Sequence, residues 1–205
     1  MTRSQAGGGP RRGDGRAPYN LDTVVDVALD VFLQRGYDAT SMEHLAAAAG
    51  VTKSAFYYHV SGKEELLERG LDRATTALFA ILDEPGPSDG TASDRLAFVL
   101  RRLVEVETGL LPEVSVLLRS RGNSAIERSA LDRRRDFDHA VAALIRAAAR
   151  EGEIRADIDP ELAARLVIGM ATWVVEWYRP GGKLGGHELA GAILAIVLDG
   201  LRPRP

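Results

Sequence analysis

Residues 40–63 hold a run of side chains that donate hydrogen bonds, and their chemistry suits contact with nucleic acid. The segment reads TSMEHLAAAAGVTKSAFYYHVSGK, and its second half carries hydroxyl, phenol, imidazole and ammonium groups. Groups of this kind bind base edges in a groove and phosphates along the backbone. The side chains that we expect to be exposed there are Thr52, Lys53, Ser54, Tyr57, Tyr58 and His59.

Two short helices joined by a tight turn would hold these donors in place. Gly50 supplies a residue that tolerates positive φ in the turn, and Ala46 permits a close crossing of the two helices. A small shared core is expected from Leu45, Ala49, Val51 and Phe56. This arrangement is a helix-turn-helix, in which the second helix enters the major groove of DNA.

The rest of the chain also has the pattern of helices. Apolar residues recur at helical spacing, and no segment has the alternation typical of a strand. Besides the two helices of the motif, we expect helices over 21–34, 63–82, 94–108, a segment opened by Pro112, 124–151, 160–178 and 187–201. The sequence therefore predicts an all-α fold of nine helices, with a breaker-rich loop over 84–93.

Polar residues indicate where these helices begin. The expected N-caps are Asn20, Thr52, Ser61 and Asp159. The second helix has two candidate caps, Thr40 and Ser41, and a capping box with Glu43 requires Thr40 as the cap.

The run GVTKSAFYYHVSGKEELL resembles the DNA-binding segment of the TetR family of bacterial transcription regulators, whose common form is GVSKGxLYYHFxSKEEL. The upstream run RGYDATSMEHLAAAAG resembles the preceding helix pair, and the match covers roughly residues 20–70 without gaps. The resemblance implies a nine-helix TetR-like architecture. It has a helix-turn-helix DNA-binding domain over 19–65 and a ligand-binding and dimerisation domain over 66–205.

The family motif assigns roles to individual positions. The residues that fall where family members approach base edges are Lys53, Ser54 and Ala55. The residues that fall where family members hold phosphates are Thr40, Thr52, Tyr57, Tyr58, His59 and Lys63. Ser54 stands where glycine is usual, and Val60 replaces the usual Phe beneath the recognition helix. A simpler interpretation stays open, in which Tyr57 belongs to the core and Tyr58 and His59 are ordinary surface residues.

Composition and charge limit other functions. The chain has 205 residues, of which 45% are hydrophobic, and a formal net charge of −3. It has no cysteine, which excludes disulfides and thiolate metal sites and suits a reducing compartment. No apolar run reaches the length of a membrane helix, so we expect a cytoplasmic protein.

Charge is distributed unevenly near the motif. Residues 19–70 carry four basic and eight acidic side chains, a net charge of −4 that argues against non-specific adhesion to DNA. We expect the acids on the outer faces of the first and fourth helices. Residues 1–18, rich in Gly, Pro and Arg, are predicted to be a disordered basic arm. The arm is either a flexible terminus or a segment that contacts DNA.

The last two expected helices suit a dimer. Two recognition helices on a two-fold axis read a palindrome, which one helix alone does not. The segments 160–178 and 187–201 both carry broad apolar faces. In the TetR family the last two helices form a four-helix bundle with the partner, so we predict a homodimer through them. Plain core packing is the alternative.

An effector site is expected in the C-terminal domain. Trp173 and Trp177 lie four residues apart and can line a pocket for a flat or apolar ligand, although ordinary packing explains them equally well. The predicted lining is Phe98, Leu118, Arg121, Phe137, Met170, Trp173 and Trp177.

The C-terminal runs WYRPGGKL and HELAGAILAIVLDGL resemble those of TetR regulators that respond to CoA thioesters. This resemblance implies an acyl- or aryl-CoA effector. Arginines available for its phosphates are Arg119, Arg121, Arg133, Arg134, Arg135, Arg146 and Arg165, although charge runs of this kind are usually solvated helix faces.

The sequence thus predicts a ligand-responsive repressor that leaves a palindromic operator when an effector moves the fourth helix. The alternatives are a constitutive DNA binder and a helical protein-interaction module, both without an effector. An enzyme is not expected, because no nucleophile, base or phosphate loop is recognisable and the four histidines lack metal-ligand spacing. No catalytic residue, metal or cofactor is predicted.

Overall fold

The computed structural model describes residues 20–87 and 90–201, and the regular structure of these segments is entirely helical. The helices are α1 (Leu21–Arg35), α2 (Met42–Ala49), α3 (Lys53–Tyr57), α4 (Lys63–Asp83), α5 (Ala92–Gly109), α6 (Leu111–Arg119), α7 (Ala125–Arg150), α8 (Pro160–Thr172), α9 (Val174–Trp177) and α10 (Gly186–Leu201). The all-α prediction is confirmed. The predicted arm over residues 1–18 lies outside the described residues.

The helix expected over 160–178 is divided. It ends as α8 at Thr172, and the four-residue α9 begins at Val174. The backbone tightens between them, because the N–H of Glu176 donates to the carbonyl of Trp173, 3.2 Å away and only three residues back. If α8 and α9 are counted together, the described segments contain the nine helices that were predicted.

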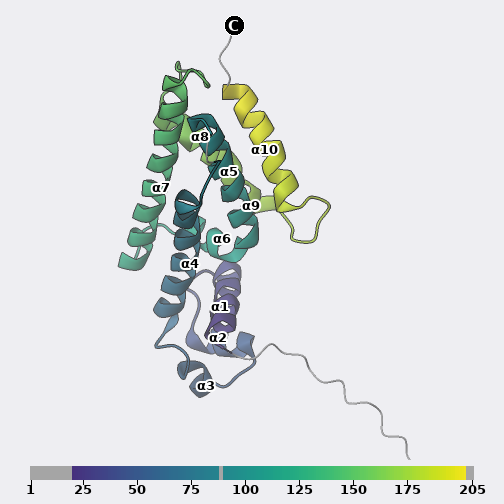
Figure 1. Cartoon of the computed structure of the whole chain (residues 1–205). Coiled ribbons are helices and arrows are strands. Elements are labelled where there is room, and N and C mark those ends of the chain that lie inside the picture. The colour runs from purple at the N-terminus through teal and green to yellow at the C-terminus, as the bar shows by residue number, and fades with distance from the viewer. Residues whose placement is uncertain (1–19, 88–89, 202–205) are drawn as a thin grey trace, which may run out of the picture.

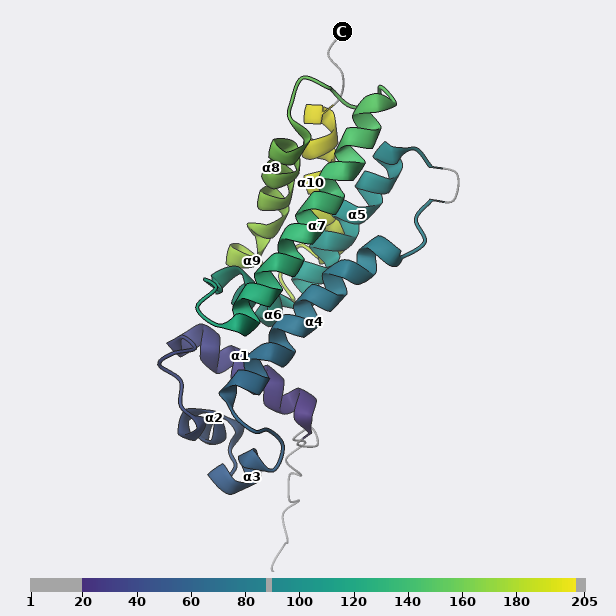
Figure 2. The ribbon, with the colours of Figure 1, turned by 90° about the vertical axis from the view of Figure 1, so that its left-hand side faces the viewer.

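The molecule is elongated, with α1, α2 and α3 gathered at one end (Figures 1 and 2). Helices α5, α7, α8 and α10 form the other end, and α6 lies beside α1 where the two parts meet. Helix α4 runs from the α3 end into the larger part, where it lies along α7 (Figure 2). The predicted domain boundary at residues 65 and 66 therefore falls inside a continuous helix.

Several predicted caps form as expected. The side chains of Asn20, Thr52 and Asp159 accept the N–H groups that open α1, α3 and α8, at distances between 2.9 and 3.2 Å. For α2 the cap is Ser41, and its capping-box partner is His44, three residues further on. A capping box between Thr40 and Glu43 is therefore not formed.

The predicted cap of α4 is wrong. Its N-cap is Gly62, which makes no side-chain capping bond. The backbone N–H and the hydroxyl of Ser61 instead both donate to Oε2 of Glu65, at 2.8 and 2.9 Å. The Glu65 carboxylate in the first turn thus satisfies the donors that precede the helix, and the Ser61 hydroxyl is directed to that carboxylate.

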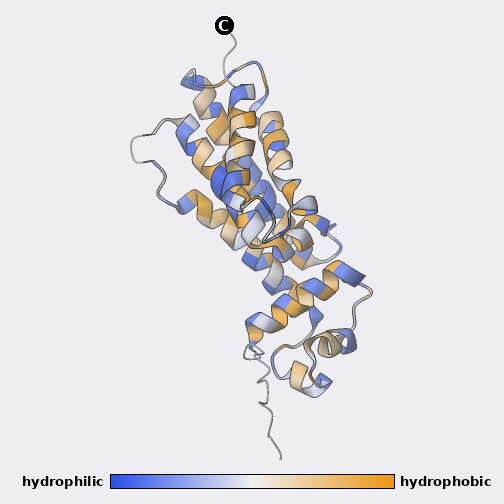
Figure 3. Ribbon diagram, turned by 90° about the vertical axis from the view of Figure 1, so that its right-hand side faces the viewer, coloured by the Kyte–Doolittle hydropathy of each residue, from blue (hydrophilic) through white to orange (hydrophobic). Residues whose placement is uncertain are grey.

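A continuous apolar core runs through both parts, with Phe56 and Phe137 as its largest fully buried side chains. Apolar and hydrophilic residues mix along the helices, as expected where each helix buries only one face (Figure 3). No helix among the described residues has the length and apolar character needed to cross a membrane.

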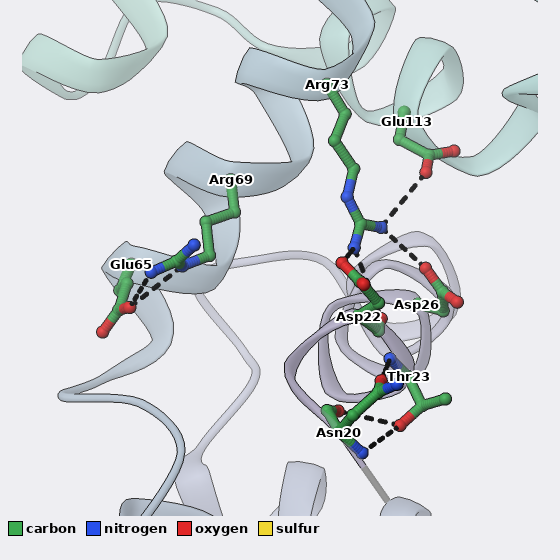
Figure 4. A network of polar contacts seen from close by, with 8 residues as sticks. All are labelled: Asn20, Asp22, Thr23, Asp26, Glu65, Arg69, Arg73 and Glu113. Carbon is green, nitrogen blue, oxygen red and sulfur yellow. Dashed lines mark hydrogen bonds and ion pairs between the residues drawn. The ribbon is translucent and has the colours of Figure 1, made fainter. Parts of the chain in front are cut away.

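Arg73 on α4 ties the two parts together (Figure 4). Its guanidinium binds the carboxylates of Asp22 and Asp26 on α1, at 2.6 and 2.7 Å, and lies 3.5 Å from Glu113 on α6. One turn earlier, Arg69 pairs with Glu65 within α4 itself. Two acids of α1 that were expected on an outer face therefore contribute to the connection between the parts.

Candidate nucleic-acid interface and ligand cavity

The turn between α2 and α3 has the predicted geometry. Gly50 adopts the left-handed conformation, with φ of 69° and ψ of 31°. The N–H of Val51 donates to the carbonyl of Ala46 across the turn, at 3.1 Å, which satisfies the end of α2. Leu45, Ala46 and Phe56 are buried, so the small shared core holds α3 at a fixed angle to α2.

Helix α3 presents its polar side chains at the end of the molecule that lies farthest from α10 (Figures 1 and 2). Thr52, Lys53 and Ser54 are exposed. Tyr57 is 45% exposed and Tyr58 is 87% exposed, so neither is a core residue. The exposure predicted for this surface is confirmed at these five positions.

The predicted exposure of His59 is wrong. Its side chain is half-buried, and its ring meets the ring of Tyr58 edge-on at 5.4 Å. Ala55 is half-buried as well. Whether these two residues touch DNA stays a prediction.

Lys53 has a partner within the protein. Its ammonium group pairs with the carboxylate of Glu43 on α2 and lies 5.9 Å from the centre of the Tyr57 ring. The hydrogen bond from Lys53 lowers the pKa of Glu43 to about 2. Because both side chains are exposed, the pair opens at little cost, and Lys53 remains able to reach another anion.

Thr40 and Lys63 point toward the protein. The hydroxyl of Thr40 is buried and donates to the carbonyl of Gly36 at 2.7 Å. The ammonium group of Lys63 donates to the carbonyls of Tyr37 and Thr40, at 2.9 and 3.0 Å, and lies 4.4 Å from the centre of the Tyr37 ring. The hydrogen bonds of these two side chains stabilise the segment that connects α1 and α2. Whether either side chain also binds phosphate stays a prediction.

The predicted effector-binding residues do not come together. Leu118 and Phe137 line one cavity. Phe98 lies half-buried against the guanidinium of Arg95, at 5.1 Å, and Arg121 is exposed near the start of α7. Neither of these two residues lines the cavity of Leu118 and Phe137.

The two tryptophans predicted to line an effector pocket lie on the surface, so that pocket stays a prediction. Met170, Trp173 and Trp177 lie on the outside of the molecule, and Trp173 is 66% exposed. They belong to an apolar face of α8, α9 and α10, which we call the α8–α10 face. Its large exposed apolar residues are Leu162, Leu166, Met170, Trp173, Trp177 and Ile196. Residues four apart, such as Trp173 and Trp177, lie on one side of a helix. That spacing predicts an apolar face, but it does not tell whether the face lines a pocket or lies on the surface.

The cavity that contains Leu118 and Phe137 also holds two carboxyl groups that the sequence analysis missed. It has a volume of about 20 Å³. The residues around it are Leu78, Leu103, Glu107, Val114, Leu117, Leu118, Arg134, Phe137, Asp138, Ile168 and Thr172. We call it the Glu107 cavity. Neither acid has a spacing that marks it, because Glu107 follows Glu105 in α5 and Asp138 lies in the charged run 132–139 of α7, where most acids belong to exposed faces.

Glu107 on α5 is 2% exposed. The hydroxyl of Thr172 donates to its Oε1 at 2.8 Å, whereas its Oε2 has no hydrogen-bond partner among the described residues. Burial raises the pKa of Glu107 to about 8, against the smaller lowering effects of Thr172 and the charge of Arg134. Oδ1 of Asp138 on α7 is likewise buried without a partner in the described part of the chain, and burial raises the pKa of this group too.

The arginines predicted to bind CoA phosphates are mostly engaged elsewhere. Arg133, Arg135 and Arg146 pair with acidic side chains, and Arg119 donates to the carbonyl of Leu33 at 3.2 Å. Of the predicted set, Arg134 is the one that lines the Glu107 cavity.

Family comparisons agree with this geometry. Residues 24–70 match the model described as bacterial regulatory proteins, tetR family, and residues 89–201 match the model described as tetracyclin repressor-like, C-terminal domain. The first match contains the whole helix-turn-helix, and the second contains α5 to α10.

Individual proteins are similar along most of the chain. The repressor KstR2 of Rhodococcus jostii is 28% identical over 185 residues, which cover 87% of this chain and 89% of that protein. The crystal structure of SCO3833, a TetR-family regulator from Streptomyces coelicolor, is 53% identical, with a TM-score of 0.82 and coverage of 92% of this chain and 94% of that one. AibR, crystallised with isovaleryl coenzyme A and operator DNA, shares the fold, with a TM-score of 0.70 at 24% identity over 86% of this chain and 96% of its own.

The raised pKa of Glu107 predicts that the folded protein loses stability as the pH rises. The folded state keeps this proton up to about pH 8, whereas the unfolded chain releases it near the ordinary value of 4.5. Between these values the group lowers the free energy of unfolding by up to about 1.4 kcal/mol per pH unit. Glu107→Gln removes this contribution, so the variant should match the wild type near pH 4.5 and become the more stable of the two as the pH approaches 8.

Urea unfolding of both proteins across this pH range measures the difference. Asp136→Asn is the matched control, because Asp136 is exposed on α7 and does not line the Glu107 cavity. A stability difference between wild type and Glu107→Gln that is constant with pH would contradict the assignment.

Proposed function

We propose that this chain, which belongs to the TetR family of bacterial regulatory proteins, is a homodimeric transcription repressor whose operator binding is controlled by a small molecule. One observation supports this function above the others. A short helix after a left-handed glycine turn stands at the end of the molecule with its lysine, hydroxyls and phenols facing solvent. That is the shape and chemistry with which a recognition helix enters a major groove.

Within this proposal the residues of α3 divide by role. Lys53, once it leaves Glu43, and Ser54 approach base edges with Ala55 beside them, while Thr52, Tyr57 and Tyr58 contact phosphates. His59, Thr40 and Lys63 support this surface from behind, through the contacts already described.

The α8–α10 face supports a homodimer as part of the proposal. An exposed apolar surface that includes two tryptophans is costly to leave in water, and a second copy of the chain covers it by symmetry. Two recognition helices then lie about 34 Å apart, the spacing of successive major grooves along one side of DNA.

Helix α4 supplies the proposed coupling. It carries Leu78 at the Glu107 cavity and Arg73 at the junction with α1, so a shift of α4 on ligand binding moves the recognition helix as well. In this proposal Arg73 transmits the shift to α1, because its ion pairs with Asp22 and Asp26 hold α1 against α4. Its contact with Glu113 links α4 to α6 as well (Figure 4).

For the effector, the C-terminal resemblance favours an acyl- or aryl-CoA, and AibR shows that one protein of this fold takes a CoA thioester. The competing function is a DNA binder without an effector. Operator affinity measured with and without candidate ligands separates the two, because only an effector changes it.

Operator binding tests the reading surface. A palindromic site can be selected from random DNA with the purified protein. Lys53→Met is expected to weaken binding by about tenfold or more and to reduce the salt dependence, because a cation that reaches DNA is lost. Glu43→Gln is expected to strengthen binding severalfold, since it frees Lys53 and removes an anion near DNA.

Asp136→Asn, which makes the same charge change as Glu43→Gln on distant α7, is the control and should bind like wild type. Fluorescence anisotropy at several salt concentrations measures all four proteins. Wild-type affinity and salt dependence in Lys53→Met would rule out α3 as the reading surface.

The oligomeric state tests the α8–α10 face. Leu166→Glu places a charge on this face, where Leu166 is 61% exposed, and is expected to convert a dimer into a monomer in light scattering. Its operator affinity should fall by more than about tenfold, because the two half-sites are no longer bound together. Ala143→Glu, at an exposed position on α7, should remain dimeric. A wild-type chain that is monomeric at micromolar concentration would contradict the dimer.

The junction at Arg73 tests the coupling. Short-chain and aromatic CoA thioesters are first screened for a change in the operator affinity of the wild type, for which family-scale coupling would be about 5- to 150-fold. In Arg73→Met the ratio of affinities with and without the active thioester is expected to approach one. Arg69→Met, whose ion pair lies within α4, should keep the wild-type ratio.

A ratio in Arg73→Met that equals the wild-type ratio would contradict the proposed route. If no thioester changes the operator affinity, the CoA hypothesis fails, and the function without an effector becomes the better one.

A further inference from the structure

We infer that the Glu107 cavity binds the protonated amine of an apolar, amine-bearing ligand, with Glu107 and Asp138 as the two groups that receive its N–H bonds. This inference rests on the proposed function only in taking the C-terminal domain as the place where a small molecule acts. It assigns an amine-bearing ligand to this cavity, whereas the C-terminal resemblance alone favours an acyl- or aryl-CoA effector.

The strongest evidence is a pair of buried carboxyl oxygens without hydrogen-bond partners. Oε2 of Glu107, on α5, and Oδ1 of Asp138, on α7, are both buried and both lack a hydrogen-bond partner among the described residues. Both side chains line the same cavity, so one ligand group can reach them together. Buried polar atoms are nearly always paired in proteins, so two unpaired oxygens at one cavity indicate a site that a donor completes.

Thr172 prepares Glu107 for this role. Its hydroxyl donates to Oε1 and thereby fixes the carboxyl group of a residue that is 2% exposed. The hydroxyl proton is used in that bond, so Thr172 offers no donor to the second oxygen. The unpaired Oε2 is thus held at the cavity by a contact that reaches from α8 to α5.

The remaining walls restrict the ligand to a particular kind. Most of the other lining residues are apolar: Leu78, Leu103, Val114, Leu117, Leu118, Phe137 and Ile168. An apolar tail alone would leave both carboxyl groups without a partner, and an anionic end would add a third acidic group beside Glu107 and Asp138. An ammonium group supplies three N–H donors and a compensating charge, and an apolar body suits the walls.

Charged neighbours modulate the site without completing it. Arg134 lines the cavity, but no ion pair within the described segments joins it to Glu107 or Asp138. Arg134, His139 and Arg165 all favour the ionised form of Asp138 through their charge. Burial dominates at both groups and raises their pKa, so a proton occupies Glu107 near neutral pH in the absence of a cation.

Binding is therefore an exchange of cations. The Glu107 carboxyl group gives its proton to the buffer, and the ammonium group then donates to the resulting carboxylate and to Asp138. The O–H bond of Glu107 is the one covalent bond that breaks, and its proton goes to the buffer. The net charge of the protein with its ligand is unchanged, because one positive charge enters and one leaves.

The size of the cavity limits which part of the ligand fits without rearrangement. A volume of about 20 Å³ accepts a group the size of a water molecule, which is also the size of an ammonium head. The apolar body extends past the half-buried Leu118 and Arg134 and displaces them. Leu78 of α4 also lines the cavity, so we expect the displacement to reach the helix that carries the coupling.

Benzylamine, benzyl alcohol and benzoate are matched probes that differ in their polar end. At millimolar concentration benzylamine is expected to raise the melting temperature of the wild-type protein, with benzyl alcohol weaker and benzoate without effect. Calorimetric titration in buffers of different ionisation enthalpy is expected to show about one proton released per benzylamine bound near pH 7, and none for benzyl alcohol.

Variants assign the effect to the two carboxyl groups. Glu107→Gln keeps the shape of the side chain but not its charge, and should weaken benzylamine at least about tenfold and abolish the proton release. Asp138→Asn should weaken it severalfold. Asp136→Asn, on the same helix and outside the cavity, should bind as the wild type does. A crystal structure with benzylamine should place the nitrogen between Glu107 and Asp138.

Three results of the binding measurements would overturn the inference. They are equal stabilisation by benzylamine and benzyl alcohol, wild-type benzylamine affinity in Glu107→Gln, and the absence of any benzylamine effect on the wild type. A guanidinium of Arg134 found between the two carboxyl groups of the complex would overturn it as well. These measurements use protein without DNA, so a chain that binds no operator would refute the proposed function and leave this test intact.

Discussion

The continuity of α4 is the constraint on which the rest of the structure depends. A single helix extends from the base of the recognition unit to the core of the larger part, so the two parts are joined by backbone hydrogen bonds and not by a flexible linker. Arg73 adds ion pairs to α1 and a contact to α6 at the middle of that helix. Displacement at either end is therefore transmitted as movement of a stiff element, provided that these side-chain contacts hold α1 against it.

The features that the sequence predicted well are those determined by local chemistry. Gly50 adopts positive φ, and Asn20, Thr52 and Asp159 cap their helices, because the residues within one turn decide each of these outcomes. The exposure of α3 followed from a motif that itself encodes a turn and a small core. Ser61 failed for an instructive reason: Glu65 competed for its hydroxyl, and such competition is not visible in a cap residue alone.

The features that were missed depend on which face of a helix meets which neighbour. Trp173 and Trp177 have the spacing of a buried stripe, yet an apolar stripe toward a partner looks the same in sequence as one toward an internal pocket. Thr40 and Lys63 matched phosphate-binding positions, but their partners lie in the connection after α1 and become visible only once the chain folds back on itself. Glu107 and Asp138 each stand close to other acids of their helices, and only tertiary packing makes these two neighbours of one cavity.

The Lys53–Glu43 pair and the Glu107 cavity differ in the free energy that changes when each binds a partner. This difference bears on how binding at one end of the molecule affects the other end. The Lys53–Glu43 pair is exposed, so its rupture on contact with DNA costs about 1 kcal/mol or less. A carboxyl group buried without a full set of donors costs about 1–3 kcal/mol, which a ligand that supplies the donors recovers. Breaking the ion pair on the recognition surface thus changes the free energy of the protein little. The Glu107 cavity, in contrast, carries an unfavourable free energy that a ligand with hydrogen-bond donors relieves. Control of α4 by the ligand, and not by the reading surface, follows from that asymmetry.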